Sequence, residues 1–235
     1  MMRILALDTS TRSCSVAVVD GCDLLAEITS GNVQTHSRRL MAMIDSALDI
    51  AGLDLARMDG LAFTCGPGSF TGVRIGISTI LGLATATRKP IAGISGLDGL
   101  AMQAAVPDMT ICTLIDGRRN EVYYAHYRWK SGKLIKVAAE QVLPPDLAIS
   151  GLKPPVMFAG NGALLYQDMI RKHLGNGACF ALNCQHTLRA STIAWIGMKR
   201  FEIGEVDDIF RFEPMYIRRP DAKIPTPFTP FQESP

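Results

Sequence analysis

The first half of the chain alternates between short apolar runs and longer amphipathic segments. Residues 3–8 alternate weakly, residues 14–19 are strongly β-prone, and residues 24–29 follow an Asp20-Gly21 pair of the kind that closes a hairpin. These runs predict three antiparallel strands. From 36 to 51 the apolar residues recur at helical spacing instead, which predicts a helix whose core-facing stripe comprises Leu40, Ile44, Ala47, Leu48 and Ala51.

A strand, a glycine turn and a second helix come next. Residues 58–64 form an apolar run that predicts a buried strand, and residues 75–86 are dense in Ile, Leu and Ala, as in a buried helix. Between them lies CGPGSFTGVRIG (65–76), whose first glycines allow unusual backbone angles or close neighbours. Ser69 and Thr71 are both suitable caps for the first turn of the helix, which we expect to begin near Thr71.

This glycine turn could bind phosphate or could serve packing. A Walker loop requires Lys and then Ser or Thr after its last Gly, whereas Val and Arg follow Gly72. The dinucleotide fingerprint requires Gly where Thr71 stands, and Pro67 removes an amide that a phosphate would use. Gly72 and Gly76 clear one face of the helix for another backbone, inside the chain or across an interface. We therefore favour a packing role.

The second half repeats the early pattern weakly. Strands are predicted over 110–115, 121–129 and 134–138, and an Asp again ends the first of them, which is what a duplicated domain leaves in a sequence. The other elements expected are a strand at 91–94, a helix at 95–105, a short helix that starts at Pro144-Pro145, a strand at 155–159, one helix from the Gly160–Gly162 turn to about His173, and a helix at 190–203 with Trp195 buried.

These patterns divide the chain into four parts. Residues 1–106 form an N-terminal subdomain and 107–188 a second one. Residues 189–217 form a helix and a strand-like segment that we expect to pack back on the body, and the Pro-rich residues 218–235 form a tail.

Composition indicates an ordinary globular protein and narrows its partners. Hydrophobic residues make up 48% of the chain and charged residues 20%. The formal net charge of +2 is too small to predict a stand-alone nucleic-acid binder. The basic doublets are interpreted as solvated surface unless the fold gathers them; they lie at 38–39, 118–119, 199–200 and 218–219.

The sequence predicts a cytoplasmic protein without a metal site. Met1-Met2-Arg3 leads directly into a strand-like run, so we expect no signal peptide, and polar residues at 78, 79, 85 and 87 interrupt the best candidate for a membrane span. The six cysteines are then most simply reduced thiols in a cytoplasmic protein. The cluster Cys179, Cys184 and His186 lacks a CxxC pair and a clear fourth ligand, so no metal site is expected.

Several motifs together resemble one known family. The stretches are ILALDTSTRSCSVAVVD (4–20), His36 with the helix after it, GPGSFTGVRIG (66–76), IDGRRNEVYYA (115–125), AGNGA (159–163) and EPMYIRRP (213–220). On these stretches, and over almost its whole length, the chain resembles the bacterial TsaB (YeaZ) family, in the glycoprotease-like branch of the actin and sugar-kinase superfold. The resemblance implies an α/β fold of the actin/sugar-kinase-like (ASKHA) type, duplicated as two βββαβα subdomains.

The resemblance points to weak nucleotide-binding candidates. In nucleotide-binding members of the superfold, an acidic residue at the position of Asp8 contacts the metal ion of the bound nucleotide. Phosphate loops usually carry Gly after this residue, whereas Thr9-Ser10-Thr11 follows it here. We therefore favour a role for Asp8 in capping that turn. In kinase-like relatives the turn at Gly160 and Gly162 lies against adenosine, although a plain strand-to-helix turn explains it equally well. At the position of Gly117 the family often has Ala. Because this chain has Gly there, nucleotide binding beside Asp116 stays an open alternative. No bound cofactor is expected.

Catalytic groups are not expected. Catalytic relatives carry two His four residues apart on one helix to bind a metal, whereas the residue four after His36 is Leu40. Ser69 stands in GPGSF and not in a GxSxG elbow, and the histidines at 36, 126, 173 and 186 have no spacing that assembles a triad. The alternatives left open are a glycoprotease-like hydrolase and a weak nucleotide-binding enzyme of the same superfold.

The resemblance implies a non-catalytic subunit. TsaB proteins are partners of TsaD, the metal- and ATP-binding paralogue that transfers threonylcarbamoyl to the adenosine beside the anticodon in tRNAs that read codons starting with A. The ATPase TsaE joins the pair, and TsaB alone forms a homodimer. We therefore expect this chain to reach tRNA only through the complex.

In the family, two helices contact the partner: the one after His36 and the one after the glycine turn. On the first, Met41, Met43 and Ile50 lie partly off the core stripe, which suits an adaptable interface or a wider core equally. Ile44 and Leu48 could serve the core instead. The predicted interface residues are Met41, Ile44, Leu48, Gly72, Arg74, Gly76, Ile77 and Ile80.

Overall fold

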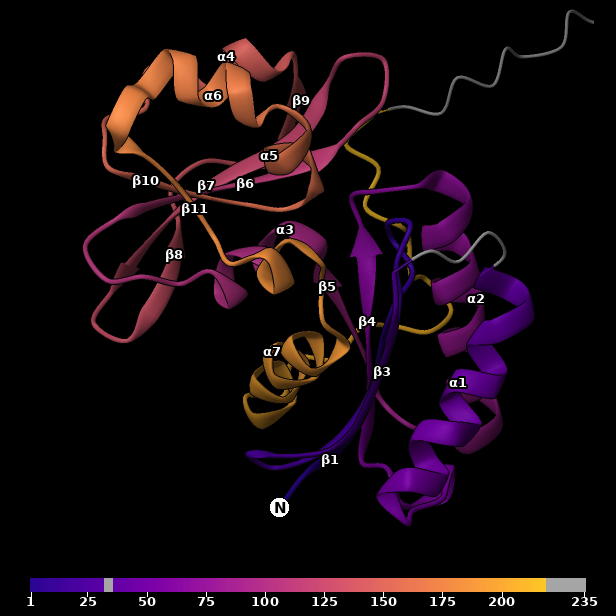
Figure 1. Ribbon diagram of the computed structural model, residues 1–235. Helices are drawn as coiled ribbons and strands as arrows, with labels where there is room; N and C mark the ends of the chain where they lie inside the picture. Colours follow the sequence, from indigo (N-terminus) through magenta and orange to yellow (C-terminus); the bar gives the residue numbers. More distant parts are fainter. Residues whose placement is uncertain (32–35, 219–235) are drawn as a thin grey trace, which may run out of the picture.

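Two β-sheets, one above the other in Figure 1, organise the molecule. The computed structural model describes residues 1–31 and 36–218, and of His36 it describes only the backbone. Except for Arg218, the tail predicted at 218–235 therefore lies outside the described residues. The predicted division into four parts stays a proposal.

The first sheet has the strand order β3-β2-β1-β4-β5. β1 (Arg3–Asp8), β2 (Cys14–Asp20) and β3 (Asp23–Ser30) form an antiparallel meander, and β4 (Gly60–Gly66) and β5 (Ile91–Ser95) continue it in parallel with β1. Two crossover helices lie side by side on the outer face of this sheet (Figure 1). They are α1 (His36–Ala51) and α2 (Phe70–Thr87); the 3-10 turn η1 (Leu55–Arg57) precedes β4, and α3 (Gly96–Gln103) follows β5.

The second sheet repeats this topology. From one edge its order is β8-β7-β6-β10-β11, with β9 also paired to β7. The order of the first sheet is therefore reproduced, and the predicted duplicated actin/sugar-kinase-like fold is confirmed. Its elements are β6 (Thr110–Asp116), β7 (Val122–Lys130), β8 (Lys133–Lys136), β9 (Gln141–Leu143), α4 (Pro145–Ile149), β10 (Val156–Ala159), α5 (Asn161–Leu165), α6 (Gln167–Leu174), η2 (Gly175–Gly177), β11 (Ala178–Phe180) and η3 (Asn183–His186).

Alternation along the strands separates the core into layers. In β1, Leu5 and Leu7 pack in the cluster under α1 and α2, whereas Ile4 and Ala6 belong to the cluster on the opposite face. This period of two is the normal consequence of strand geometry. The second cluster also includes Ile111 of β6, so the two sheets share one apolar core.

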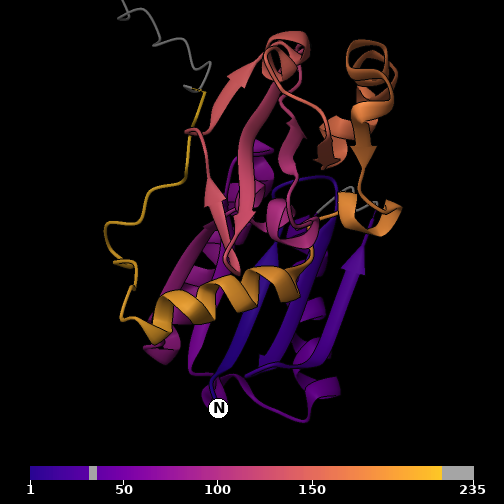
Figure 2. The same ribbon diagram turned by 90° about the vertical axis from the view of Figure 1, so that its left-hand side faces the viewer.

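The last helix, α7 (Ala190–Glu202), returns the chain to the first sheet. Figure 2 shows it lying across the strands of that sheet, below the second sheet. The approach is close because the facing residues are small: a Cβ added to Gly197 would lie 2.6 Å from the Cβ of Ala62. Trp195 remains 38% exposed, so the prediction that it is buried is wrong, because Ala194 and Met198 fill the buried side instead.

Residues 203–218, the C-terminal strap, tie distant parts of the chain together. The strap runs from the end of α7 up the side of the molecule to the second sheet (Figure 2). The amide of Asp207 donates to the carbonyl of Ile91 at 3.0 Å, and that of Met215 donates to the carbonyl of Cys65 at 2.9 Å. Farther along, Nη1 of Arg218 donates to the carbonyl of Gly117 at 2.8 Å.

Three local expectations differ from the structure. The single helix predicted up to His173 is two helices, α5 and α6, which meet at Tyr166. The short strands β9 and β11 were not predicted, because three residues are too few to establish a period. Finally, α2 is long and apolar enough to cross a membrane by length and composition alone, although its buried residues, Val73, Ile77 and Ile80 among them, lie against the first sheet.

Candidate functional site

The glycine turn after β4 packs against the chain's own β1–β2 turn. The amide of Ser69 donates to the carbonyl of Ser10 at 2.7 Å, and the hydroxyl of Thr9 donates to the carbonyl of Gly72 at 2.7 Å. A Cβ on Gly68 would overlap the carbonyl of Ser10, and one on Gly72 would overlap that of Thr9. The space that these glycines open is thus filled by backbone from inside the chain.

Asp8 organises that same turn. Its side chain is fully buried, and Oδ1 accepts hydrogen bonds from the amide of Ser10 at 3.0 Å and from its hydroxyl at 2.6 Å. A carboxylate that bonds the backbone two residues on is the usual means by which Asp stabilises a tight turn. The geometry agrees with the capping role favoured from the sequence.

Asp116 and Gly117 begin the tight β6–β7 turn. Oδ1 of Asp116 accepts from the amide of Arg118 at 2.9 Å, and the amide of Gly117 donates to the carbonyl of Glu121 at 2.9 Å. Residues 118, 119 and 120 all have left-handed backbones, with φ of 61°, 54° and 58°. Arg rarely adopts this conformation, so the turn depends on its surroundings, and such strain concentrates at functional sites.

Gly160 and Gly162 serve contact between α5 and β6. Gly160 has φ of 100°, and a Cβ added to it would overlap the carbonyl of Leu114. A Cβ on Gly162 would lie 2.9 Å from the same oxygen. Between the two glycines, Oδ1 of Asn161 accepts from the amide of Asp116 at 3.1 Å. A strand-to-helix packing turn therefore accounts for both glycines.

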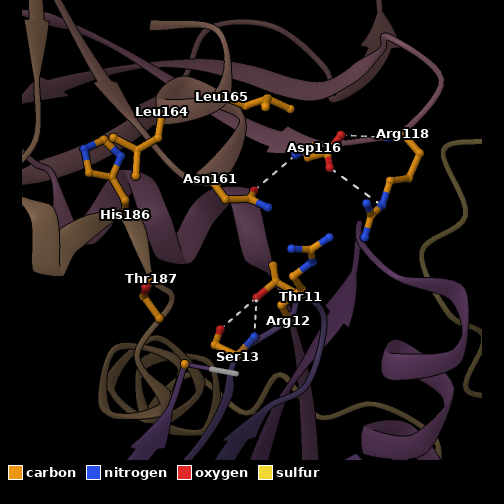
Figure 3. A pocket seen from close by; sticks show the side chains of 11 residues that line it. Thr11, Arg12, Ser13, Asp116, Arg118, Asn161, Leu164, Leu165, His186 and Thr187 are labelled. Atoms are coloured by element: carbon orange, nitrogen blue, oxygen red, sulfur yellow. Dashed lines mark hydrogen bonds and ion pairs between the residues drawn. The ribbon is translucent and has the colours of Figure 1, made fainter. Parts of the chain in front are cut away.

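A cleft of about 560 Å³ opens between the two halves of the molecule (Figure 3). Arg12 extends into it from the β1–β2 turn and Arg118 from the β6–β7 turn, and a 3.7 Å ion pair joins Arg118 to Asp116. Leu164 and Leu165 form its apolar side. The remaining lining residues are Thr11, Ser13, Gly31, Asn161, His186 and Thr187.

His186 anchors the wall of the cleft. It is buried, and its two ring nitrogens lie 3.1 Å from the carbonyl of Gly160 and 3.0 Å from that of Ala181. The ring thereby joins the start of α5 to the segment after β11. Its nitrogens are engaged with backbone and do not face the cleft as free ligands.

The candidate nucleophiles are occupied or buried. The hydroxyl of Ser69 accepts from the amide of Gly72 at 3.3 Å, which makes it a helix cap. Burial, together with the nearby carboxylate of Asp8, raises the pKa of Cys14 to about 12, and burial raises that of Cys65 to about 12. Both thiols therefore stay protonated near neutral pH, the form that is a poor nucleophile.

Histidines and metal-ligand types are scattered. The three histidines whose side chains are described lie in β7, α6 and η3, all outside the half that contains Ser69. Within residues 1–31 and 36–218, no three His, Cys, Asp or Glu side chains gather closely enough to hold a metal ion.

The structure separates the predicted interface residues into buried and exposed sets. Met41 is 45% exposed, and Arg74 is exposed as well. The others are buried within the chain, because they face the first sheet or the Thr9–Ser10 turn, and their burial does not support direct contact with a partner; they are Ile44, Leu48, Gly72, Gly76, Ile77 and Ile80.

Arg74 joins α2 to the strap. Its Nε donates to the hydroxyl of Tyr216 at 2.8 Å, and its guanidinium carbon lies 3.8 Å from the ring centroid of Phe70. The two rings stack with centroids 5.6 Å apart, and they are 44% and 38% exposed. Arg74 therefore lies in an exposed aromatic cluster at the start of α2.

Several residues of this region could not be found from sequence. Arg12, Leu164 and Leu165 line the cleft, but nothing in their local sequence distinguishes them from surface or core residues. Arg218 lies in the matched EPMYIRRP stretch, which was the one available signal. Its contact with the β6–β7 turn spans about one hundred residues of chain, and no local pattern encodes it.

Comparisons with known proteins agree with one another. Residues 24–226 match the family described as "TsaD: tRNA N6-adenosine threonylcarbamoyltransferase". The chain is 32% identical over 228 residues to the tRNA threonylcarbamoyladenosine biosynthesis protein TsaB of Bacillus subtilis, covering 94% of this chain and 96% of the relative.

Solved structures extend this likeness to the fold. YeaZ from Pseudomonas aeruginosa superposes with a TM-score of 0.79 at 30% identity, covering 92% of this chain and 100% of that one. The (R)-2-hydroxyglutaryl-CoA dehydratase component A of Acidaminococcus fermentans gives a TM-score of 0.55 at 13% identity, covering 85% and 99%, and so shares the fold alone.

Proposed function

The chain belongs to the TsaB (YeaZ) family, within the wider TsaD-type family, and from this we propose that it is a non-catalytic subunit that supports a TsaD paralogue. Its pathway is the biosynthesis of threonylcarbamoyladenosine in tRNA, as for its relatives. In this proposal the paralogue performs the transfer to the adenosine beside the anticodon, and the present chain provides a docking surface. TsaE joins the pair, and the chain alone forms a homodimer.

One observation carries the non-catalytic part of the proposal. Thr9 and Ser10 occupy the space above Gly68 and Gly72, where a phosphate-binding turn would leave its amides open to a ligand. Asp8 is engaged in holding that turn. The residues of the glycine turn thus support the fold, and catalysis is assigned to the partner.

The docking part of the proposal rests on the outer helix layer. α1 and α2 form the layer that covers the first sheet from outside. Met41 of α1 is 45% exposed. Methionine adapts readily to a partner surface. We assign Met41 and Arg74 to the direct contact, while the buried residues beneath them fix the position of the two helices.

The central experiment is reconstitution with the TsaD paralogue from the same cell. Unmodified tRNA, ATP and threonylcarbamoyl-adenylate are incubated with the chain, with the paralogue, or with both, and modified adenosine is measured. We expect product only when the paralogue is present, and more of it when this chain is added. Product formed by this chain alone would contradict the non-catalytic assignment.

An Asp8→Asn variant tests the structural role of Asp8 in the same assay. Asn keeps an oxygen that can accept both hydrogen bonds from Ser10, so the turn and the complex activity should be largely retained. A loss of activity by orders of magnitude in a normally folded variant would show instead that the negative charge binds a nucleotide metal.

A further inference from the structure

We propose that the cleft between the two sheets, with the surface that continues from it along the C-terminal strap, directly binds the phosphate backbone of RNA. This goes beyond the expectation that tRNA is reached only through the partner. The identity of the RNA rests on the proposed function, which makes tRNA the substrate of the complex.

Arginines from both halves meet in the cleft. Arg12 and Arg118 are exposed and project into it, and Asp116, the carboxylate among its lining residues, already pairs with Arg118. Within the described residues, no carboxylate pairs with Arg12. Two arginines and one carboxylate line the cleft, so it carries a small excess of positive charge although the net charge of the whole chain is only +2. The Arg118-Arg119 doublet is one of those interpreted from the sequence as solvated surface.

Two more arginines lie between the cleft and the start of α2. Arg218 donates to the carbonyl of Gly117, pairs with Glu121, and lies with its guanidinium carbon 5.7 Å from the ring centroid of Tyr123. Two residues earlier in the strap, Tyr216 accepts from Arg74. We call Arg12, Arg118 and Arg218 the arginine track; Tyr123 lies beside its last member, and the track ends where Tyr216 of the strap meets Arg74 of the proposed docking surface.

The chemistry of this track fits an extended polyanion. Guanidinium groups bond phosphate oxygens in pairs, and both aromatic faces and guanidinium planes stack on unpaired bases. A single nucleotide would instead need a cradle of backbone amides around its phosphates. The glycine turns that could provide one are filled by Thr9, Ser10 and the carbonyl of Leu114. Phosphates met one by one along a strand require no such cradle.

Salt-dependent binding of a tRNA transcript is the test. The full chain is titrated with an unmodified tRNA that reads a codon starting with A, over a series of salt concentrations. In the variant Arg12→Gln/Arg118→Asn, Asn tolerates the left-handed backbone at 118. If each lost phosphate contact lowers the slope of log K against log salt by about 0.7, as for single strands, the variant should lose about 1.4 from the slope, and it should bind more weakly.

The matched control removes two charges elsewhere. Arg128 and Lys130 are exposed near the far end of β7, with Arg128 about 20 Å along the strand from Val122 at the cleft end. The variant Arg128→Gln/Lys130→Gln should keep the wild-type slope and affinity. Equal losses in the two variants, or no loss in the cleft variant, would overturn the proposal, because binding would then be diffuse or located elsewhere.

Two further measurements separate the alternatives. Melting curves and co-sedimentation with the TsaD paralogue are recorded for each variant, and we expect both to match wild type. If the wild-type chain does not bind the paralogue, the proposed function fails regardless of the RNA result. ATP binding is measured as well. If ATP binds the wild type and binds the cleft variant more weakly, while both bind tRNA equally well, the cleft is a nucleotide site and the RNA proposal is wrong.

Discussion

At the scale of single residues, two glycines of α2 lie in different surroundings, one against backbone and one in open space. Gly72 lies against the carbonyl of Thr9, with no room for a methyl group, whereas Gly82 on the same helix has nothing within 4 Å of where a Cβ would stand. The sequence predicted that Gly72 and Gly76 admit another backbone, but it left open whether that backbone was internal. The sequence could not decide between an internal and an external backbone, because the contact is made by a turn more than sixty residues away.

This contrast gives a matched pair of substitutions. Gly72→Ala should destabilise the protein by about 1–3 kcal/mol, because the new methyl group must displace the Thr9–Ser10 turn. Gly82→Ala should stabilise it by about 1 kcal/mol, because Ala is the better helix former and no neighbour is disturbed. Unfolding in denaturant measures both. Equal effects of the two changes would mean that helix propensity, and not the contact with Thr9, governs position 72.

At the scale of elements, hydrophobic periodicity predicted most of the regular structure. α1 spans the residues predicted for it, and the strands of the first sheet begin and end within two residues of the expected positions. The predicted core-facing residues of α1, Leu40, Ile44 and Leu48, are buried as expected. Burial on the remaining face of α1 could not be decided from the pattern, because a wide core and an interface both place apolar residues there.

The two faces of α1 allow the proposed docking surface to be tested. Met41→Glu should abolish self-association and binding to the TsaD paralogue, because a partner would have to desolvate an unpaired charge. The melting temperature of the monomer should change little, since Met41 is 45% exposed. The control is Ile50→Glu: Ile50 is 67% exposed, and nine residues at about 100° each bring it to the other side of the helix.

Sedimentation of each variant, alone and mixed with the paralogue, provides the readout. Ile50→Glu should associate as wild type does. Wild-type affinity of the Met41 variant would show that this face of α1 does not meet the partner. Unfolding of that variant would assign Met41 to the core, the alternative that the sequence left open.

At the scale of the whole molecule, the duplicated topology could be predicted, but the contacts between its parts could not. Both halves show, in the sequence, three successive strands of which the first ends in Asp, and the two sheets have the same strand order. The cleft depends on Arg12 and Arg118, which come from different halves. Contacts of this kind follow from how sheets are stacked, and no spacing within one segment encodes them.

The strap should contribute measurably to the union of the two sheets. Arg218→Met removes the donor to the carbonyl of Gly117 and the partner of Glu121, and hydrogen bonds to charged groups contribute about 1.5–3 kcal/mol. We expect a loss of stability near the lower end of that range and faster hydrogen exchange in the β6–β7 turn. Arg211→Met is the control, because Arg211 is on the same strap but its side chain is 88% exposed, with Asp208 at 3.9 Å.

The position of α7 also affects the order in which the protein can be completed during synthesis. The inner face of the first sheet, including Ile4 and Ala6, is covered by a helix that starts at Ala190, long after the last strand of that sheet ends at Ser95. At the pace of a ribosome, that interval takes on the order of 5–20 seconds. A nascent chain with all five strands already made therefore still lacks its cover, and the apolar face remains open to chaperones or to neighbouring chains until α7 has emerged.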